Sequence, residues 1–537
     1  MKIKQLLTIR KLSQKDKKWI HKDIFRILRS EEIWIIAYEN IKSNKGALTA
    51  GITSLTMDGM PMRRLKRLQE SVYSGKFKFK PVKLTNIKRP DGSQIPLGLP
   101  TANDKIVQEV MRIILDAIYE PGFVDESFGF RAGLGCHDAL NHVENKFRWV
   151  DYIIEGDIEQ AYPTIDHRIL MNILRKRIDD RRFLDLVWKA LKSGVFCEER
   201  IEWLEIGVPQ RSIVSPILAN IYYNELDEFV KTLKIKYETP VSERNNLKSS
   251  ASKALEYKIR KISRTLRHHE SHSQERQNLI KELKTLRAER LKTNGLKDKK
   301  IRLEYVRYAD DWMIGVAGDR KLTSKIKEEV SIFAKEILAQ IVYPNKTKIT
   351  NIRKGNAQFL GYEIFLPKNR PISIYKGKGV RTIRRGQPQL RFDIPIRKVT
   401  KRYVERGYLK QLSKGVRPIS KASYAALEDH VIVSHYRSLW LGLKNYYSGC
   451  TRRGRLQYFH YLLHMSCAMT LAHRHRMSSK KIFKKHKKTL TVKIKDTGKT
   501  VSFPYKTTWK LSERRWLCGK KVNVSTKDYF KNLVSRS

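Results

Sequence analysis

The sequence predicts an α+β fold in which a strand-based domain is followed by a helical one. The short apolar run Tyr152-Ile153-Ile154 is typical of a buried strand. A second pair of apolar runs, within residues 303–316, flanks two adjacent aspartates and predicts a β-hairpin. Between and after these runs, apolar residues recur at helical spacing, and helical patterns dominate from about residue 375 to about residue 485.

The first hundred residues predict helices followed by an extended segment. An amphipathic pattern from Asp23 to Ile41 predicts a helix, and a basic helix is expected around residues 62–73. Residues 81–100 are typical of extended structure, with Pro90-Asp91-Gly92 as a turn. From residue 103 to residue 119 the apolar side chains again recur at helical spacing, so a further helix is expected there.

Between about residues 236 and 300 the composition shifts to Lys, Arg, Glu and Gln, with almost no Gly or Pro. Two apolar stripes, one around Leu255 and Ile262 and one around Leu279 and Leu286, predict a helical hairpin inserted in the main domain. Beyond it, residues 376–386 form a connector rich in Gly and Arg, and a basic tail closes the chain. We find no internal repeat.

The charge balance indicates a polyanionic partner. The chain has 537 residues, with 110 Lys and Arg against 54 Asp and Glu, and a formal net charge of +56. Such self-repulsion favours nucleic acid as the partner, because phosphate neutralisation releases counterions and drives binding. An anionic membrane surface is the alternative. No apolar run approaches the roughly 20 residues of a spanning helix, so no membrane partner is expected.

The cysteines and histidines predict no structural metal site or disulfide framework. The five cysteines are scattered and none forms a CxxC pair. His268, His269 and His272 lie in the predicted helical hairpin, where a solvated helix face is a simpler explanation than metal binding. Buried cysteines in a reducing compartment are therefore expected.

Three aspartates are the candidate catalytic residues. Asp157 ends the predicted strand, just before a helix whose N-cap is expected at Asp166. Asp310 and Asp311 occupy the predicted hairpin turn, and carboxylates in an apolar context are costly unless a cation satisfies them. Mg²⁺ prefers carboxylate oxygens, and two such ions can support nucleotidyl transfer. The alternative is that the Asp-Asp pair is an ordinary turn.

The order of these motifs resembles that of the group II intron-encoded proteins, the maturases with a reverse transcriptase domain. The resemblance is carried by nine segments in order: Ala37 to Gly46, Pro96-Leu97-Gly98-Leu99-Pro100-Thr101, Phe128-Gly129-Phe130-Arg131, Asp157 to Tyr162, Gly207-Val208-Pro209-Gln210 with Ser215 to Asn220, Tyr308-Ala309-Asp310-Asp311, Phe359-Leu360-Gly361-Tyr362, Gly442 to Tyr447, and Ser466 to Ala472. These segments extend over most of the chain, up to about residue 485.

The resemblance implies a right-hand polymerase with fingers and palm, followed by an α-helical thumb and maturase domain X. The implied divisions are residues 1–80 (N-terminal extension and first block), 81–375 (fingers and palm, with the insertion at about 236–300), 376–485 (thumb and domain X) and 486–537 (a basic tail). Some relatives add an HNH endonuclease. None is expected here, because only Cys518 and no histidine follows Lys488.

The resemblance also implies roles for individual residues. Asp157 and Asp310 would bind two Mg²⁺ ions, with Asp311 adjacent, and Tyr162 would crowd the sugar 2′ carbon of the incoming nucleotide. Further nucleotide contacts are implied for Lys88, Arg131 and Gln210. Two departures from the family pattern, Ile95 and Arg211, remove a charged contact and add bulk where the backbone approaches the nucleotide.

Basic and aromatic residues of the second helical region are candidates for RNA binding. Lysines between residues 480 and 488 suit phosphate contact, although such a run is often only a solvated face. Aromatic residues close to basic ones can stack unpaired bases, although at least half are expected to be packing residues. The candidates are Lys444, Tyr446, Tyr447, Arg474, Lys480 and Lys481.

The implied function is binding of the host group II intron RNA to promote splicing, with RNA-directed DNA synthesis for intron mobility. The implied partners are that RNA, a DNA target or primer, and dNTPs, and a homodimer stays open. The alternative is a splicing cofactor whose polymerase site is degenerate; a retron-type enzyme is disfavoured by domain X. An organelle is the expected location, the mitochondrion before the plastid.

Overall fold

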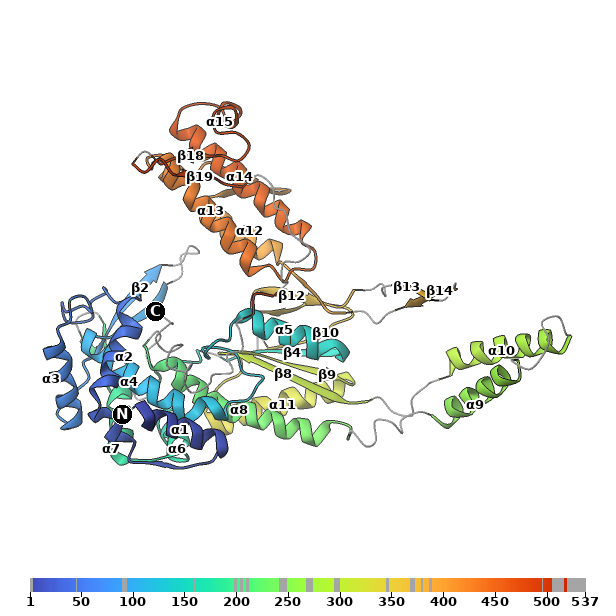
Figure 1. Ribbon diagram of the computed structural model, residues 1–537, viewed down its shortest axis with the longest axis horizontal. Coiled ribbons are helices and arrows are strands. Elements are labelled where there is room, and N and C mark those ends of the chain that lie inside the picture. Colours follow the sequence, from blue (N-terminus) through green and yellow to red (C-terminus); the bar gives the residue numbers. More distant parts are fainter. Residues whose placement is uncertain are drawn as a thin grey trace.

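The computed structural model describes most of the chain (Figure 1). The described residues are 3–44, 46–88, 94–158, 160–197, 200–202, 206–208, 212–240, 249–266, 274–293, 300–343, 347–367, 372–377, 380–385, 389–494, 496–504 and 516–518. Among the helices in these ranges, none has both the length and the hydropathy that crossing a bilayer requires.

A four-stranded antiparallel sheet forms the centre of the molecule. Its strand order is β10-β4-β9-β8, where the strands are Lys348–Asn351, Tyr152–Asp157, Asp311–Ala317 and Arg302–Tyr308. Successive side chains alternate between two hydrophobic cores, as Ile153 and Ile154 do in β4. Both hydrophobic cores therefore pack against this sheet, one on each face. The strands that the sequence predicted around residues 152–154 and 303–316 are confirmed.

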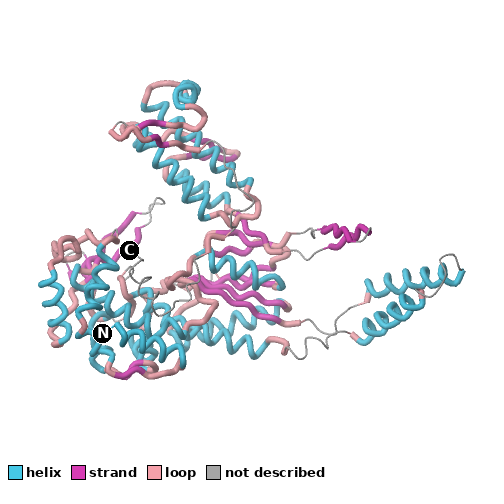
Figure 2. The backbone as a smooth tube through the Cα atoms, viewed as in Figure 1, coloured by secondary structure: helices cyan, strands magenta, loops and turns pink. Residues whose placement is uncertain are grey.

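Helices cover both faces of this sheet (Figures 1 and 2). The first core is closed by α8 (Ser215–Tyr237) and α11 (Arg320–Leu338), and the second by α5 (Cys136–Lys146). Helix α6 (His167–Arg175) begins at Asp166, whose side chain accepts hydrogen bonds from the backbone N–H groups of Arg168 and Ile169, so the predicted N-cap is confirmed. Helix α7 (Arg181–Leu191) adds to the first core.

The N-terminal region packs its helices on α4 (Ala102–Tyr119), which confirms the helix predicted there and is almost wholly buried. The prediction of one helix from Asp23 to Ile41 was wrong. The chain forms a 3₁₀ helix, η1 (Ile24–Arg29), and then α2 (Glu31–Lys42), with Ser30 in an extended conformation between them. The break lets the buried Trp34 donate its indole N–H to the Leu28 carbonyl.

The remaining helices and strands of the first 200 residues are short or peripheral. They are α1 (Ile3–Lys15), β1 (His21–Lys22), α3 (Met62–Tyr73), η2 (Glu120–Gly122), η3 (Phe147–Trp149) and β5 (Ile178–Asp179). A separate four-stranded sheet has the order β3-β2-β6-β7, with strands Gln94–Leu99, Val82–Lys88, Val195–Cys197 and Arg200–Glu202. Its β2–β3 hairpin occupies the segment predicted to be extended, and the predicted turn at 90–92 lies outside the described residues.

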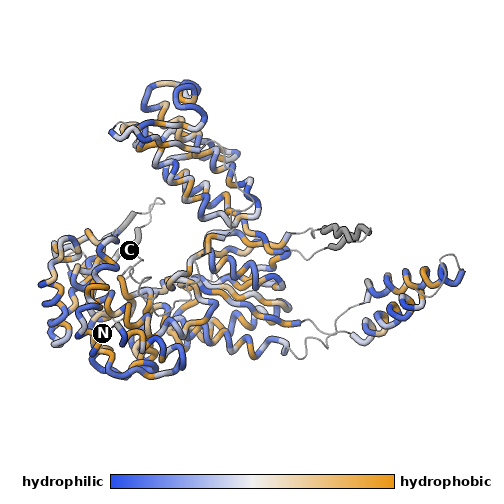
Figure 3. Tube along the Cα trace, viewed as in Figure 1, coloured by the Kyte–Doolittle hydropathy of each residue, from blue (hydrophilic) through white to orange (hydrophobic). Residues whose placement is uncertain are grey.

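Two helices, α9 (Ser250–Thr265) and α10 (Gln274–Lys292), lie side by side and apart from the rest of the molecule (Figure 1). Hydrophobic and hydrophilic segments alternate along both of them (Figure 3). Leu255 and Ile262 of α9 and Leu283 of α10 are buried in their contact. His268, His269 and His272, for which a solvated face was predicted, lie outside the described residues.

A helical domain rises from a three-stranded sheet of β11 (Ala357–Phe359), β12 (Tyr362–Phe365) and β15 (Arg391–Asp393) (Figure 1). Its helices are α12 (Ile396–Glu405), α13 (Asp429–Tyr446), α14 (Gly454–Arg474) and α15 (Ser479–His486). Its core is continuous with the second core of the central sheet. The predicted apolar face of α14 is confirmed, because Leu456, Phe459, Leu463, Cys467 and Leu471 are all buried. The smaller elements are β13 (Ile372–Gly377), β14 (Val380–Arg385), β16 (Leu409–Leu412), β17 (Gly415–Pro418) and η5 (Ala422–Tyr424).

The packed domain does not end at residue 485, where the sequence suggested that a basic tail begins. Strands β18 (Val492–Lys493) and β19 (Thr500–Val501) follow α15, and Leu490, Val492 and Phe503 are buried in the same core. Farther along, Trp516 packs in that core and donates its indole N–H to Glu144 of α5 at 2.5 Å. Apolar residues spaced among the lysines therefore attach this segment to the domain.

Candidate active site

Asp157 and Asp311 lie directly opposite each other at the end of the central sheet. Asp157 closes β4, Asp311 opens β9, and the two are register partners of the antiparallel pair. Tyr308 and Asp311 are also register partners, so Ala309 and Asp310 form a two-residue turn between β8 and β9. Ala309 has the left-handed φ of +58° that such tight turns require. The predicted hairpin is present, but only Asp310 lies in its turn; the prediction that Asp311 also lies there was wrong, because Asp311 is the first residue of β9.

The adjacent residues Asp310 and Asp311 have different surroundings. Asp157 and Asp311 line a cavity of about 460 Å³ together with Glu155, Leu360 and Lys398. Side chains of consecutive strand residues point to opposite faces, and Asp311 is on the same face as Met313 of the second core. Asp310 lies in the turn and close to Tyr162, whose pKa is raised by burial and further by the Asp310 charge.

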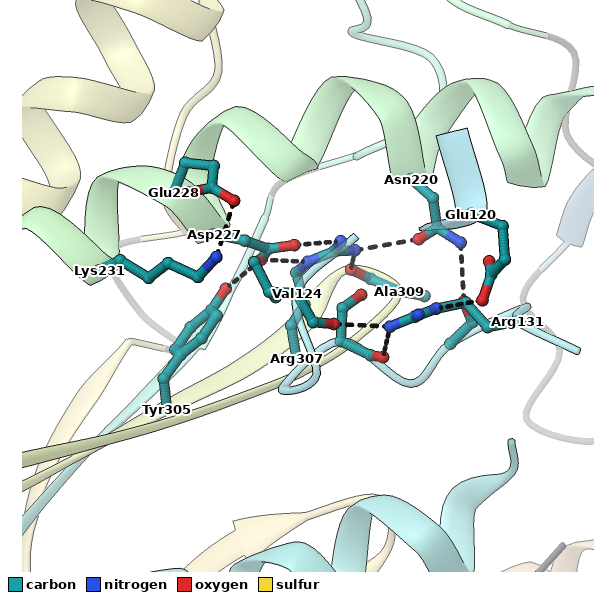
Figure 4. Close-up of polar contacts among 12 residues, drawn as sticks. Glu120, Val124, Arg131, Asn220, Asp227, Glu228, Lys231, Tyr305, Arg307 and Ala309 are labelled. Carbon is teal, nitrogen blue, oxygen red and sulfur yellow. Dashed lines mark hydrogen bonds and ion pairs between the residues drawn. The ribbon is translucent and has the colours of Figure 1, made fainter. Parts of the chain in front are cut away.

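A buried arginine holds the hairpin turn from the side of helix α8 (Figure 4). Arg307, two residues before Ala309, donates Nη1–H to the Ala309 carbonyl at 2.9 Å and to Asn220 Oδ1 at 3.2 Å. Its Nε–H and Nη2–H groups each donate to a carboxylate oxygen of Asp227 at 2.7 Å. The guanidinium therefore joins helix α8 to the turn through a planar set of charge-assisted bonds.

Gly129 also lies against this turn. A Cβ atom at this position would lie 2.3 Å from the Ala309 backbone nitrogen, so no side chain fits there. The Gly129 carbonyl accepts a hydrogen bond from Asn220 Nδ2 at 2.8 Å, and the neighbouring Phe128 N–H donates to the Arg307 carbonyl at 2.9 Å. The Phe128-Gly129-Phe130-Arg131 segment is thus a backbone support for the aspartate turn.

A steric constraint of the same kind precedes Asp157. Trp312 is buried beside Gly156, its register partner, and a Cβ atom on Gly156 would lie 2.1 Å from the indole ring. The Glu155-Gly156-Asp157 segment thus needs glycine at its centre, because the ring fills the space that a side chain would take.

Tyr162 is held near Asp310 by buried polar side chains. Tyr223 donates its hydroxyl to the Ala161 carbonyl at 2.8 Å, and Gln340 Nε2 donates to the Thr164 carbonyl at 2.6 Å. The Tyr162 carbonyl accepts the Val208 N–H at 2.9 Å. These bonds fix the loop on both sides of Tyr162 and leave its ring half-buried beside the aspartate turn.

The side chains of several residues predicted to contact the nucleotide are not among those that the structure describes. Lys88 ends β2, but its side chain is not among the described ones, and the same holds for Ile95 in β3. Gln210 and Arg211 lie outside the described residues. The residues that flank them are anchored. Val208 bonds to Tyr162, and Ser212 donates its hydroxyl to Gln108 Oε1 at 2.6 Å.

Arg131 belongs to the framework of the site in this structure. Its guanidinium pairs with Glu120 at 2.9 Å and donates Nη1–H to the carbonyls of Val124 at 2.6 Å and Ser127 at 2.7 Å (Figure 4). Its side chain is 9% exposed. An arginine held by one carboxylate and two carbonyls shapes the loop behind Gly129, and its contact with the nucleotide stays a prediction.

The predicted RNA-binding residues divide into packing and surface groups. Tyr446 and Tyr447 donate their hydroxyls to the carbonyls of Leu360 at 2.6 Å and Gly361 at 3.1 Å, which attaches α13 to the turn bordering the cavity. Arg474 is ion-paired with Asp429 at 3.0 Å. Lys444 is half-buried, whereas Lys480 and Lys481 of α15 are exposed.

Sequence reasoning missed the residues that position the turn, namely Arg307, Asp227 and Asn220. One signal was available. Arg307 interrupts the apolar run Tyr305-Val306 before the aspartates, and Asp227 stands among apolar residues of a helix. Two opposite charges at positions that periodicity assigns to a core are typical of a buried pair, because a lone buried charge is costly.

Two stretches of the chain match described protein families. Residues 87–239 match the reverse transcriptase family (RNA-dependent DNA polymerase), and residues 387–527 match the type II intron maturase family. The first stretch contains Asp157 and Tyr162, and the second contains helices α12 to α15.

Individual relatives are similar over most of the chain. The group II intron-encoded protein LtrA of Lactococcus lactis subsp. cremoris is 33% identical over 471 residues, which cover 87% of this chain and 77% of the relative. A 91 kDa protein in the cob intron of Schizosaccharomyces pombe is 33% identical, with 93% of this chain and 61% of the relative covered. For the COX1/OXI3 intron 1 protein of Saccharomyces cerevisiae the identity is 31% and the coverages are 86% and 54%. The chain thus spans little more than half the length of the two yeast relatives.

Proposed function

Because the chain belongs to the group II intron-encoded proteins, with a reverse transcriptase domain and a type II intron maturase domain, we propose that it binds its host intron RNA, promotes splicing of that RNA and copies RNA into DNA for intron mobility. The observation that carries the polymerase part is the pairing of Asp157 with Asp311 across two strands, with Asp310 in the adjoining turn. Carboxylates meet there at the edge of a cavity.

Asp157, Asp310 and Asp311 offer carboxylate oxygens at one end of the sheet, which are donors that Mg²⁺ prefers, so two Mg²⁺ ions are proposed here. Asp157 and Asp310 would hold them, and Asp311 adds a carboxylate on the same face as Asp157. Ions held there would supply activation of a primer 3′-hydroxyl and charge stabilisation for the departing pyrophosphate. The protein supplies the positions, because Arg307 and Gly129 fix the turn on which Asp310 lies.

Tyr162 is the proposed sugar-selecting residue. Its half-buried ring lies close to Asp310, and Tyr223 and Gln340 hold the loop that carries it. A planar ring fixed next to the incoming nucleotide can exclude a 2′-hydroxyl by steric contact, so dNTPs are the proposed substrates. Lys88 and Gln210 are proposed to contact the nucleotide and template.

The helical domain of α12 to α15 is proposed to be the thumb and domain X, with α9 and α10 as an insertion in the palm. Exposed Lys480 and Lys481 suit contact with intron RNA phosphates, together with Lys444. A formal charge of +56 favours such contact. A DNA target or primer is the second nucleic acid, and the proposed location is an organelle, the mitochondrion first.

The alternative is a splicing cofactor whose polymerase site is degenerate, which Ile95 and Arg211 favour. Both proposals are tested with purified protein in two assays, primer extension on an RNA template with dNTPs and Mg²⁺, and splicing of the host intron. DNA synthesis that disappears in an Asp310→Ala, Asp311→Ala variant supports the polymerase. If the wild-type protein promotes splicing but synthesises no DNA, only the alternative proposal, a splicing cofactor with a degenerate polymerase site, is supported.

A further inference from the structure

Three potential metal ligands converge in the helical domain, far from the aspartate turn. Asp429 is the first residue of α13, His475 follows α14, and His486 is the last residue of α15. One ligand atom from each lies within 4.8 Å of the other two. Within the described part of the chain, no other three His, Cys, Asp or Glu side chains meet this criterion.

His486 has the hydrogen-bonding pattern of a metal ligand. Its Nδ1 atom lies 3.3 Å from the Thr491 carbonyl, and a carbonyl can only accept, so Nδ1 carries the proton. Its Nε2 atom is buried and has no hydrogen-bond partner. In the neutral ring that nitrogen therefore holds a lone pair pointing at no donor. Metal-binding histidines use this arrangement, with one nitrogen donating to a carbonyl and the other facing the ion.

Asp429 and His475 form the other half of the cluster. The imidazole Nε2 of His475 lies 2.9 Å and 2.8 Å from the two carboxylate oxygens of Asp429. Arg474 Nε donates to one of these oxygens, Oδ1, at 3.0 Å, which leaves Oδ2 facing His475. An ion held at ordinary Zn–N and Zn–O distances would need ligand atoms roughly 3.4 Å apart. The Asp429 and His475 atoms are 2.8 Å and 2.9 Å apart, so binding would require them to separate by about half an ångström.

We propose that Asp429, His475 and His486 bind one divalent transition-metal ion, of which Zn²⁺ is the best fit, with water as a fourth ligand. Two imidazoles and one carboxylate suit Zn²⁺ in tetrahedral geometry, whereas Mg²⁺ prefers oxygen donors alone. The ion would clamp the end of α15 to α13 and α14. It would thereby fix the segment that carries Lys480 and Lys481.

The simpler explanation is an Asp429–His475 ion pair that needs no metal. It accounts for two of the three residues, but it leaves the buried Nε2 of His486 without a partner. Buried polar atoms in folded proteins almost always have one. A metal ion explains all three side chains together.

The test uses the full-length protein, stripped with EDTA and titrated with Co²⁺ and Zn²⁺. We expect one equivalent of Co²⁺ to give the visible bands of a tetrahedral site, which Zn²⁺ then displaces. Affinity should fall at least tenfold in His486→Ala and in Asp429→Asn. His473→Ala is the matched control, because His473 is an exposed histidine two residues from His475, and it should bind like the wild type.

Far-UV circular dichroism in EDTA checks that each variant is folded. The proposal is overturned if the wild-type protein binds no stoichiometric Co²⁺ or Zn²⁺. It is equally overturned if folded His486→Ala binds as tightly as the wild type, because the ion would then be held elsewhere. Since neither readout uses nucleic acid or polymerase activity, failure here leaves the proposed function untouched.

Discussion

The guanidinium of Arg307 and the carboxylate of Asp227 share two hydrogen bonds of 2.7 Å, and both side chains are fully buried next to the turn that carries Asp310. Burial alone would lower the pKa of Arg307, but the Asp227 charge outweighs it and the pKa is raised. The guanidinium of Arg307 therefore stays charged. Its position between helix α8 and the turn couples stability of the sheet to placement of the aspartates.

Replacing Asp227 with Asn should destabilise the protein and disable DNA synthesis. Breaking a buried pair leaves an uncompensated charge, which costs about 3–5 kcal/mol. Urea denaturation measures this free energy. Glu228→Gln is the matched control, because the neighbouring Glu228 forms an exposed ion pair with Lys231 at 2.8 Å and its loss should cost less than about 1 kcal/mol. Equal effects of the two substitutions would contradict the assignment of Arg307 as the support of the turn.

Adding one methyl group at Gly129 should displace the aspartate turn. The new Cβ would meet the Ala309 nitrogen at 2.3 Å, a backbone atom that cannot move aside without moving Asp310. Misplacement of catalytic groups by about 1 Å can reduce rates by about 100-fold. Gly442→Ala, where no atom lies within 4 Å of the added Cβ, should leave primer extension unchanged. Wild-type rates in Gly129→Ala would show that the contact is relieved without effect.

Tyr446 should act in packing rather than in RNA binding. Its hydroxyl bonds to the Leu360 carbonyl, so Tyr446→Phe should lower the free energy of unfolding by about 0.5–1.5 kcal/mol. Intron affinity, measured by filter binding, should stay within twofold. Tyr458, an exposed aromatic of α14, is the comparison residue for base stacking. A large loss of intron affinity in a Tyr446→Phe protein of normal stability would indicate that the Tyr446 hydroxyl contacts RNA.

Two surface lysines should contribute to the salt dependence of RNA binding. If Lys480 and Lys481 each contact a phosphate, the double Gln variant should reduce the slope of log affinity against log salt by about 1.4 for single-stranded RNA. Lys231→Gln is the control, because Lys231 is engaged with Glu228 on α8. An unchanged slope would mean that α15 does not touch RNA.

His21 should give the protein a stability that depends on pH. Burial lowers its pKa from the ordinary 6.5 to about 4, and the nearby Arg177 adds to the shift. The folded protein therefore favours the neutral ring, and its contribution is complete above pH 6.5 and is lost as the pH falls toward 4. Relative to His21→Gln, the wild-type protein should lose stability in that window. A difference that does not vary with pH would contradict the shift, and His473→Gln is the exposed control.

Periodicity and motif order predicted much of the fold. The apolar run before Asp157 and the runs around Asp310 are strands because each side meets a core, and the α14 stripe is buried as its spacing indicates. The break at Ser30 was missed, since a 3₁₀ turn and an α-helix have similar apolar patterns. The packing of Phe503 was missed because isolated apolar residues in a basic segment carry little periodicity.

The site was only partly predictable for a different reason. Asp157 ends a strand and Asp310 lies in a hairpin turn, and local sequence can indicate both positions. The bonds from Arg307 to Asp227 join residues 80 positions apart, and no local pattern specifies such a partner. The attachment of Tyr446 to Leu360, 86 positions away, is of the same kind, so its aromatic ring was a candidate for stacking until its contacts were seen.

The most direct test of the polymerase site compares Asp157→Asn with Glu155→Gln in Mg²⁺-dependent primer extension on RNA. Both carboxylates are half-buried, belong to β4 and line the same cavity, but Glu155 accepts hydrogen bonds from Thr350 and the Gln358 N–H and is not assigned to a metal. We expect Asp157→Asn to abolish DNA synthesis and Glu155→Gln to retain it. Synthesis by a folded Asp157→Asn protein at the wild-type rate would contradict the account.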